Sequence, residues 1–154
     1  MLNEGDTAPN FSAKDDKGNT VSLKDLRGTK VVLYFYPKDD TSGCTKEACD
    51  FRDNLNRIKR KDAVVIGVSP DSEKSHLKFK TKFDLTFPLI VDEDKTLVNL
   101  YEVWKEKSMY GRKYMGVERT TFVIDEKGKI AKIFSKVKVP GHVDAVMQAL
   151  DAIK

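Results

Sequence analysis

The hydrophobic positions of the chain follow two different periods, one typical of strands and the other of helices. Residues 31–36 form a continuous run of β-branched and aromatic side chains without alternation. Such a run is typical of a central strand that is covered on both faces. Residues 63–68 have the same character and end at Ser69 and Pro70. These two segments predict the buried strands of a sheet.

Between the two buried strands the period changes to that of a helix. Pro37 ends the first strand, and from about Thr41 apolar residues recur at steps of three and four. The positions of this stripe are Cys44, Ala48, Phe51, Leu55 and Ile58. One apolar face at this spacing predicts an amphipathic helix that begins soon after the strand.

The remaining segments predict shorter elements. Residues 11–13 and 20–23 flank a turn-forming segment rich in Asp, Gly and Asn, which favours a β-hairpin. Further strands are expected at 89–91, 121–124 and 129–134, and further helices at 72–83, 96–101 and 141–153. The helix at 72–83 has Leu77, Phe79 and Phe83 as its apolar points. Strands and helices alternate in the first part of the chain, and the strands at 121–124 and 129–134 form a hairpin near its end. This order predicts an α/β fold with a mixed central sheet and helices on both faces.

Length, composition and charge narrow the class of protein. A chain of 154 residues suits one domain, so we expect residues 1–154 to form a single unit. Its 28 basic and 24 acidic residues are interspersed, which is typical of a solvated surface and not of a nucleic-acid footprint. No apolar run approaches the roughly 18 residues of a membrane span, and the first residues lack the pattern of a secretory signal. These features predict a cytoplasmic protein that binds neither nucleic acid nor membrane.

The chain has only two cysteines, Cys44 and Cys49. A lasting structural disulfide is not expected in a reducing cytoplasm, so the pair needs another explanation. Cys44 falls in or near the first turn of the predicted helix, where free N–H groups and the helix dipole favour a thiolate. Thr41 or Ser42 could cap this helix.

An intact helix would keep the two cysteines apart. Five residues rise ~7.5 Å and turn about 500°, which puts the two Cα atoms roughly 8–9 Å from each other. Disulfides rarely exceed ~7 Å between Cα atoms. Either the pair never bonds, or bonding unwinds this turn.

Spacing alone leaves other interpretations open. Two cysteines on one helix are often small buried hydrophobic residues. Zinc would need about four ligands, and besides the cysteines only His76 and His142 are available, each of which we expect at the surface. A thioredoxin-type dithiol would need the spacing C-x-x-C, whereas Cys44 and Cys49 have the spacing C-x-x-x-x-C. The aromatic residues Trp104 and Tyr110 could line a pocket or pack in the core.

Pro37, Thr41 and Cys44 form the spacing P-x-x-x-T-x-x-C, which resembles the active-site motif of the peroxiredoxins. Cys49, five residues later, resembles the second cysteine of the bacterioferritin comigratory protein, or peroxiredoxin Q, branch of that family. Three further segments of this chain resemble other parts of the family sequence, namely residues 5–11, 31–37 and 118–125.

The resemblance implies a thioredoxin-like fold with an N-terminal β-hairpin extension, and a thiol peroxidase activity. Cys44 would be the peroxidatic thiolate, and Cys49 would attack its sulfenic acid to leave an intramolecular disulfide. Thr41 would hydrogen-bond the thiolate and the peroxide. Arg119 would stabilise the thiolate and polarise the peroxide, and Pro37 would shield the sulfur from water. Outside this motif, Thr41 would be a helix cap, Arg119 a surface ion-pair residue and Pro37 a strand terminator.

The resemblance also implies partners. A hydroperoxide would be reduced to water or an alcohol, and thioredoxin or a similar dithiol protein would recycle the disulfide, as part of antioxidant defence and redox homeostasis. No metal, haem or flavin is implied, and a cysteine pair within one subunit permits a monomer. Two rival functions stay open, namely a thiol–disulfide oxidoreductase that acts on proteins and a redox-sensing binding module.

Overall fold

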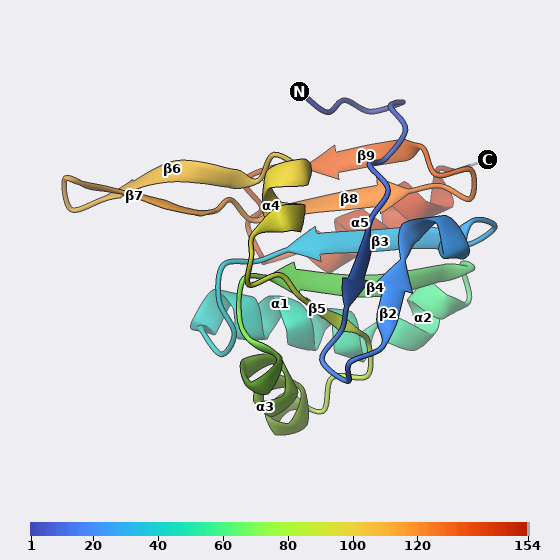
Figure 1. The fold of residues 1–154 in the computed structure, drawn as a ribbon. Coiled ribbons are helices and arrows are strands. Elements are labelled where there is room, and N and C mark those ends of the chain that lie inside the picture. The colour runs from blue at the N-terminus through green and yellow to red at the C-terminus, as the bar shows by residue number, and fades with distance from the viewer. Residues whose placement is uncertain (154) are drawn as a thin grey trace.

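A five-stranded mixed sheet forms the centre of the computed structural model, which describes residues 1–153 (Figure 1). Its strands run in the order β5-β4-β3-β8-β9. Their bounds are β3 Lys30–Phe35, β4 Ala63–Ser69, β5 Leu89–Val91, β8 Thr120–Ile124 and β9 Ile130–Phe134. β4 pairs in parallel with β3 and β5, whereas β8 pairs antiparallel with β3 and β9. The predicted mixed sheet, with the run at 31–36 at its centre, is confirmed.

Side chains of β3 alternate between two hydrophobic cores, one on each face of the sheet. Val32 and Tyr34 belong to the core that contains buried residues of α1, α2, α3 and α5, and Val31 and Leu33 belong to the core beneath α4. The helices are α1 Ser42–Asp53, α2 Leu55–Lys59, α3 Glu73–Phe83, α4 Thr96–Leu100 and α5 His142–Asp151. Burial on both faces explains why this strand shows no hydrophobic alternation. Among residues 1–153, no helix is long and apolar enough to cross a membrane.

The predicted N-terminal hairpin is present as β1 Ser12–Lys14 and β2 Thr20–Ser22, which pair antiparallel. Within the turn, the side chain of Asp15 accepts two backbone N–H hydrogen bonds, each of 2.9 Å. This carboxylate closes the turn locally, as short acidic side chains commonly do. A 3-10 helix, η1 Leu23–Leu26, then leads the chain towards β3.

A second hairpin, absent from the predicted elements, projects from the body of the molecule (Figure 1). It consists of β6 Trp104–Met109 and β7 Arg112–Val117. Charged and polar residues fill most of β6, and most side chains of β7 are exposed whether they are polar or apolar, so neither strand shows the alternation of a half-buried strand. Tyr110 at the turn is 98% exposed, so the expectation that it packs in the core or lines a pocket is wrong. Trp104 is half-buried against the core beneath α4, in agreement with the packing interpretation.

The predicted helical stripe is divided between two helices, because α1 ends at Asp53 and α2 begins at Leu55. Asn54 lies between them with φ −106° and ψ 7°, and its side-chain amide donates to the carbonyl of Asp50 at 2.8 Å. All five apolar positions of the stripe are nevertheless buried. The pattern therefore predicts the packed face correctly but not the break.

In α3, one expected apolar position lies at the surface and one expected surface residue is buried. Leu77 is 47% exposed, whereas His76 is fully buried. Phe79, three residues after His76, is also buried, so the two share the face that packs on the sheet. The expectation that His76 lies at the surface is wrong, because both of its ring nitrogens find hydrogen-bond partners in the interior.

Candidate active site

The loop that carries the motif connects the central strand to the first helix. Tyr36 continues the line of β3, and its N–H donates to the carbonyl of Val68 on β4 at 3.0 Å. Pro37 follows and is partly buried, and α1 begins directly after its N-cap residue, Thr41. Cys44 is consequently the third residue of α1 and lies in its first turn, as predicted.

Arg119 binds the sulfur of Cys44 across 75 residues of sequence. Its Nη2 donates to Cys44 Sγ at 3.1 Å. The antiparallel register explains this contact, because Phe35 at the end of β3 lies opposite Thr120 at the start of β8. The residue before β8 therefore lies beside the chain that leaves β3. Cys44 is only 2% exposed, so the guanidinium is fixed against a sulfur that is almost closed to solvent.

Glu47 holds the other side of the same guanidinium. It lies one turn after Cys44 on α1, is fully buried, and its Oε1 accepts a hydrogen bond from Arg119 Nη1 at 2.6 Å. Burial disfavours charge on Arg119, but the charges of Glu47 and Cys44 outweigh this effect and raise the pKa of the arginine. Glu47 has no role in the predicted site, although its position three residues after Cys44 places both on one helix face.

The second oxygen of Glu47 faces a histidine without a hydrogen bond. Glu47 Oε2 lies 3.8 Å from His142 Nε2 and has no hydrogen-bond partner among residues 1–153. His142 Nε2 is instead hydrogen-bonded to Thr121 Oγ1 at 2.8 Å. Burial, together with the charge of Arg119, lowers the pKa of His142 to about 4, so its ring is neutral at pH 7. Burial also raises the pKa of Glu47 to about 7 against the opposing effect of Arg119.

His142 is thus buried, and the expectation that it lies at the surface is wrong. It is the first residue of α5, a helix that packs against α1. Its ring lies edge-on to Phe51 and Phe134, with centroid distances of 6.2 and 5.3 Å. These aromatic contacts come from distant parts of the chain, so the local pattern around residue 142 gives no sign of them.

Thr41 contributes its backbone and its hydroxyl to different partners. Its carbonyl accepts from the N–H of Thr45 at 2.8 Å, which starts the helix. Its hydroxyl makes no capping hydrogen bond and donates instead to the carbonyl of Lys38 at 2.9 Å. The hydroxyl hydrogen is therefore engaged within the loop, and the oxygen keeps its capacity to accept.

Cys49 lies on the same unbroken helix as Cys44 and is half-buried. Both thiols are free. Helical geometry holds positions five residues apart out of disulfide range, and the structure shows the pair in this separated arrangement.

Gly43 gives Arg119 room to approach the helix. A Cβ atom at this position would lie 3.3 Å from Arg119 Nη2, closer than most Cβ contacts. The absence of a side chain at residue 43 therefore lets the guanidinium lie against the first turn of α1. This requirement comes from tertiary structure and is not visible in the local sequence.

A cysteine buried in the first turn of a helix, and bound by an arginine that directly precedes a strand of the central sheet, defines a thiol-based redox enzyme. The chain belongs to the AhpC/TSA family, whose model matches residues 4–133. It is 51% identical over 146 residues to the peroxiredoxin Bcp of Bacillus subtilis, which covers 95% of this chain and 93% of that protein. It is 42% identical over 149 residues to the peroxiredoxin Bcp of Escherichia coli, which covers 97% and 96%.

Solved structures show the same fold. Peroxiredoxin Q of Xanthomonas campestris matches with a TM-score of 0.88 at 42% identity, over 92% of this chain and 90% of that one. A mutant PrxQ of Xylella fastidiosa matches with a TM-score of 0.93 at 39% identity, over 99% and 97%. The predicted thioredoxin-like fold and the resemblance to the peroxiredoxin Q branch are confirmed, and the protein is a peroxidase of this class.

Proposed function

We propose that this peroxidase reduces hydroperoxides with Cys44 as its nucleophile and Cys49 as its resolving thiol. The observation that carries the proposal is the 3.1 Å hydrogen bond from Arg119 Nη2 to a sulfur that is only 2% exposed. A structure of the related bacterioferritin comigratory protein of Xanthomonas campestris concerns its alkyl peroxide reduction activity. That relative supports organic hydroperoxides as substrates, and we propose hydrogen peroxide beside them.

In the first step, the Cys44 thiolate attacks the terminal oxygen of the hydroperoxide. The S–O bond forms as the O–O bond breaks, so Cys44 is oxidised to a sulfenic acid. The leaving alkoxide or hydroxide takes up a proton to become an alcohol or water. Negative charge moves from sulfur to the leaving oxygen, and a cation already fixed beside the sulfur stabilises that charge without rearranging. Arg119 is such a cation, because Glu47 holds its other nitrogen.

Thr41 and Pro37 complete the site. The Thr41 hydroxyl donates its hydrogen bond to the Lys38 carbonyl, so the hydroxyl oxygen can accept a hydrogen bond from the O–H group of the hydroperoxide. It can donate to the thiolate only by releasing the Lys38 carbonyl. We assign Pro37 the role of shielding the sulfur from water; it is partly buried and has no N–H group that could act as a competing donor.

In the second step, the Cys49 thiol attacks the sulfenic sulfur of Cys44. The S–S bond forms, the S–O bond breaks, and water leaves. Because α1 is continuous across both cysteines, this step requires its first turns to unwind. Prompt resolution keeps the sulfenic acid from further oxidation to the irreversible sulfinic form.

Thioredoxin or a similar dithiol protein would close the cycle. It would be oxidised to its own disulfide while the Cys44–Cys49 disulfide is reduced to two thiols. Both cysteines belong to one chain, which supports a monomer as the working unit. The need for a reducing dithiol pool supports the cytoplasm as the compartment and antioxidant defence as the role.

A peroxide assay coupled to thioredoxin and its reductase tests this function with two matched variants. Cys44→Ser should lose all turnover. Cys49→Ser should consume about one equivalent of peroxide, as sulfenic acid chemistry requires, and then stall unless a small external thiol is added. Full thioredoxin-dependent turnover by Cys44→Ser would sink the assignment. Disulfide exchange with protein substrates at similar rates in the absence of peroxide would favour a thiol–disulfide oxidoreductase instead.

A further inference from the structure

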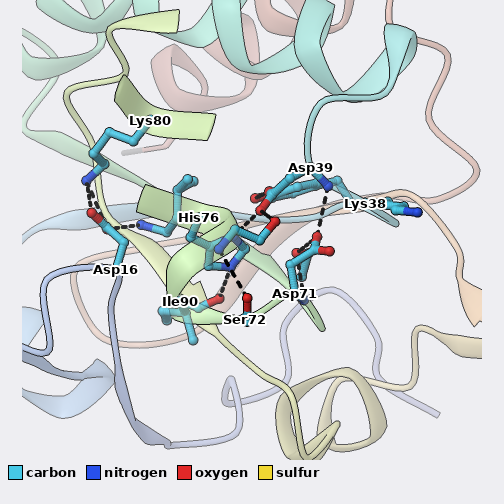
Figure 2. Close-up of polar contacts among 12 residues, drawn as sticks. Asp16, Lys38, Asp39, Asp71, Ser72, His76, Lys80 and Ile90 are labelled. Atoms are coloured by element: carbon cyan, nitrogen blue, oxygen red, sulfur yellow. Dashed lines mark hydrogen bonds and ion pairs between the residues drawn. The ribbon is translucent and has the colours of Figure 1, made fainter. Parts of the chain in front are cut away.

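A buried carboxylate lies in the loop between β3 and α1, two residues before Thr41. Asp39 is 7% exposed and collects donors from three directions (Figure 2). Its Oδ1 accepts from the Tyr36 hydroxyl at 2.6 Å, and its Oδ2 accepts from the Ser75 hydroxyl at 2.8 Å. The same Oδ2 lies 2.7 Å from His76 Nδ1. Asp39 therefore links the active-site loop to α3.

His76 extends this link to the sheet. Its Nε2 lies 2.8 Å from the carbonyl oxygen of Ile90 on β5 (Figure 2). A carboxylate and a backbone carbonyl can only accept, so each of the two ring nitrogens has to carry a hydrogen. A neutral imidazole has only one such hydrogen. The two contacts together therefore require the charged imidazolium.

The groups around His76 support this charge. Burial disfavours the charged ring, but Asp39, the Ile90 carbonyl and Asp71 together outweigh burial and raise the pKa of His76 above its ordinary value of 6.5. A second carboxylate, Asp71, also favours the charge and accepts from the Asp39 N–H at 2.8 Å. Tyr36 on the β3 side is neutral, because burial raises its pKa well above the usual range. Lys80, one turn along α3, is held away by Asp16 at 2.9 Å (Figure 2).

A metal ion is a poorer explanation of the same cluster. Asp39, Asp71 and His76 offer ligand atoms within 4.8 Å of one another. The facing oxygens, however, already accept from hydroxyl, backbone and imidazole donors, and Asp71 Oδ2 also accepts from the Ser69 hydroxyl at 2.6 Å. Hydrogen bonds alone satisfy the cluster.

The position of the pair gives it a consequence for the reaction. Asp39 lies on the short segment that leads into the first turn of α1, and that turn has to be folded for peroxide attack and unwound for resolution. Building on the function proposed above, we propose that the His76 imidazolium is a positioning residue. By holding Asp39 it stabilises the folded, peroxide-reactive turn, and its release favours the unwound turn in which Cys44 and Cys49 can bond.

The pH dependence follows from the direction of the shift. A histidine whose folded pKa is raised stabilises the folded form fully below its ordinary value of 6.5. The stabilisation is lost as the pH rises through the raised value. Above that value the neutral ring can keep only one of its two bonds, so the loop is held less firmly and resolution is favoured over peroxide attack.

Nitrogen-15 NMR of the reduced chain of residues 1–154 tests the charge of His76 without any peroxide. Both ring nitrogens of His76 should give the shifts of an imidazolium at neutral pH. In Asp39→Asn, the same ring should titrate at lower pH than in the wild type. A His76 ring that is neutral at neutral pH in the wild type would refute the proposal, whether or not the enzyme is active.

Single-turnover kinetics test the positioning role. Rapid quenching separates the rate of sulfenic acid formation, measured in a Cys49→Ser background, from the rate of disulfide formation with Cys49 present. His76→Gln should slow the first rate several-fold and speed the second several-fold. Ser75→Ala removes one bond to Asp39, keeps good helix propensity, and should shift both rates in the same directions by less. Ser75→Ala also carries the test if His76→Gln does not fold.

Lys78→Gln, an exposed change on the same helix, is the matched control and should leave both rates unchanged. If His76→Gln or the milder Ser75→Ala slows both steps together, or changes neither, the positioning role is wrong. The wild-type chain is measured first. If it forms no sulfenic acid at Cys44, the proposed peroxidase function fails, and that result is distinguishable from a wild type that reacts while the variants show no split.

Discussion

Glu47 Oε1 and Arg119 Nη1 form a part-buried ion pair at 2.6 Å, and the same guanidinium binds Cys44 Sγ through its other terminal nitrogen. The carboxyl group and the sulfur lie one helical turn apart on α1, so the pair fixes Arg119 against the nucleophile. Glu47 Oε2 stays without a hydrogen bond among residues 1–153. A buried polar atom without a partner is costly, which indicates that the position serves chemistry as well as stability.

Glu47→Ala should impair peroxide attack because it releases the guanidinium. We expect the second-order rate constant for sulfenic acid formation to fall by about tenfold or more, equivalent to about 1.4 kcal/mol of transition-state stabilisation. Glu47→Gln keeps an oxygen that can accept from Arg119 and should recover part of the loss. Stopped-flow kinetics in a Cys49→Ser background measure both variants. Equal rates for wild type and Glu47→Ala would show that Arg119 is held by other contacts.

The stability of the protein should depend on pH through Glu47. Burial raises its pKa from 4.5 to about 7, so the folded state holds this proton more tightly than the unfolded chain does. The resulting stabilisation is complete below pH 4.5 and is lost as the pH rises through 7. Its size is at most about 3 kcal/mol.

Urea unfolding of reduced Glu47→Gln and wild type across this range measures the effect. The free energy of unfolding of the variant relative to the wild type should rise between pH 4.5 and 7. The comparison cancels the opposite slope of His142, because its pKa is lowered to about 4 mainly by burial, which Glu47→Gln leaves in place. Parallel stability curves for the two proteins would contradict the raised pKa.

Gly43→Ala should separate activity from stability. Alanine is favoured over glycine inside a helix by about 1 kcal/mol, so the melting temperature should stay the same or rise. The added Cβ would lie 3.3 Å from Arg119 Nη2, so the guanidinium has to move by a few tenths of an ångström. We therefore expect slower peroxide attack in a protein that is no less stable, measured by stopped flow and thermal unfolding. Unchanged kinetics would mean that the close approach at residue 43 does not matter.

Oxidation should unwind the first turns of α1. In the reduced structure both cysteines lie on a continuous helix, Ser42–Asp53, which cannot accommodate a disulfide between them. Hydrogen–deuterium exchange after one equivalent of peroxide should therefore rise around residues 44–49 and stay unchanged in α5. Cys49→Ser, treated in the same way, should keep its protection. A disulfide formed with full protection of α1 would show that the helix argument is wrong.

The sequence predicts most of the sheet, because buried strands such as 31–36 and the stripe that begins at Cys44 carry strong local patterns. It does not predict β6 and β7, since these mostly exposed strands follow no hydrophobic period. The exposure of Leu77 and the burial of His76 are not predicted either. The hydrogen bonds that make burial of His76 possible are made to Asp39 and Ile90, which are distant in the sequence.

The residues of the family motif can be identified from the sequence, whereas the residues that hold them in place can be identified only from the structure. In the structure Arg119 donates to Cys44 Sγ, and the parts that Glu47 and Gly43 play become visible only because the start of β8 places this arginine beside α1. The roles of Thr41, Pro37 and Cys49 rest on the family motif and on the predictions above.

Mass spectrometry of the Cys49→Ser variant after one equivalent of hydrogen peroxide identifies the sulfur that reacts with peroxide. With a trapping reagent for sulfenic acids, we expect a single adduct, located on the peptide that contains Cys44, and stoichiometric loss of peroxide. Cys44→Ser under the same conditions should give no rapid adduct. Peroxide consumption that leaves Cys44 unmodified would contradict the assignment of this sulfur as the nucleophile.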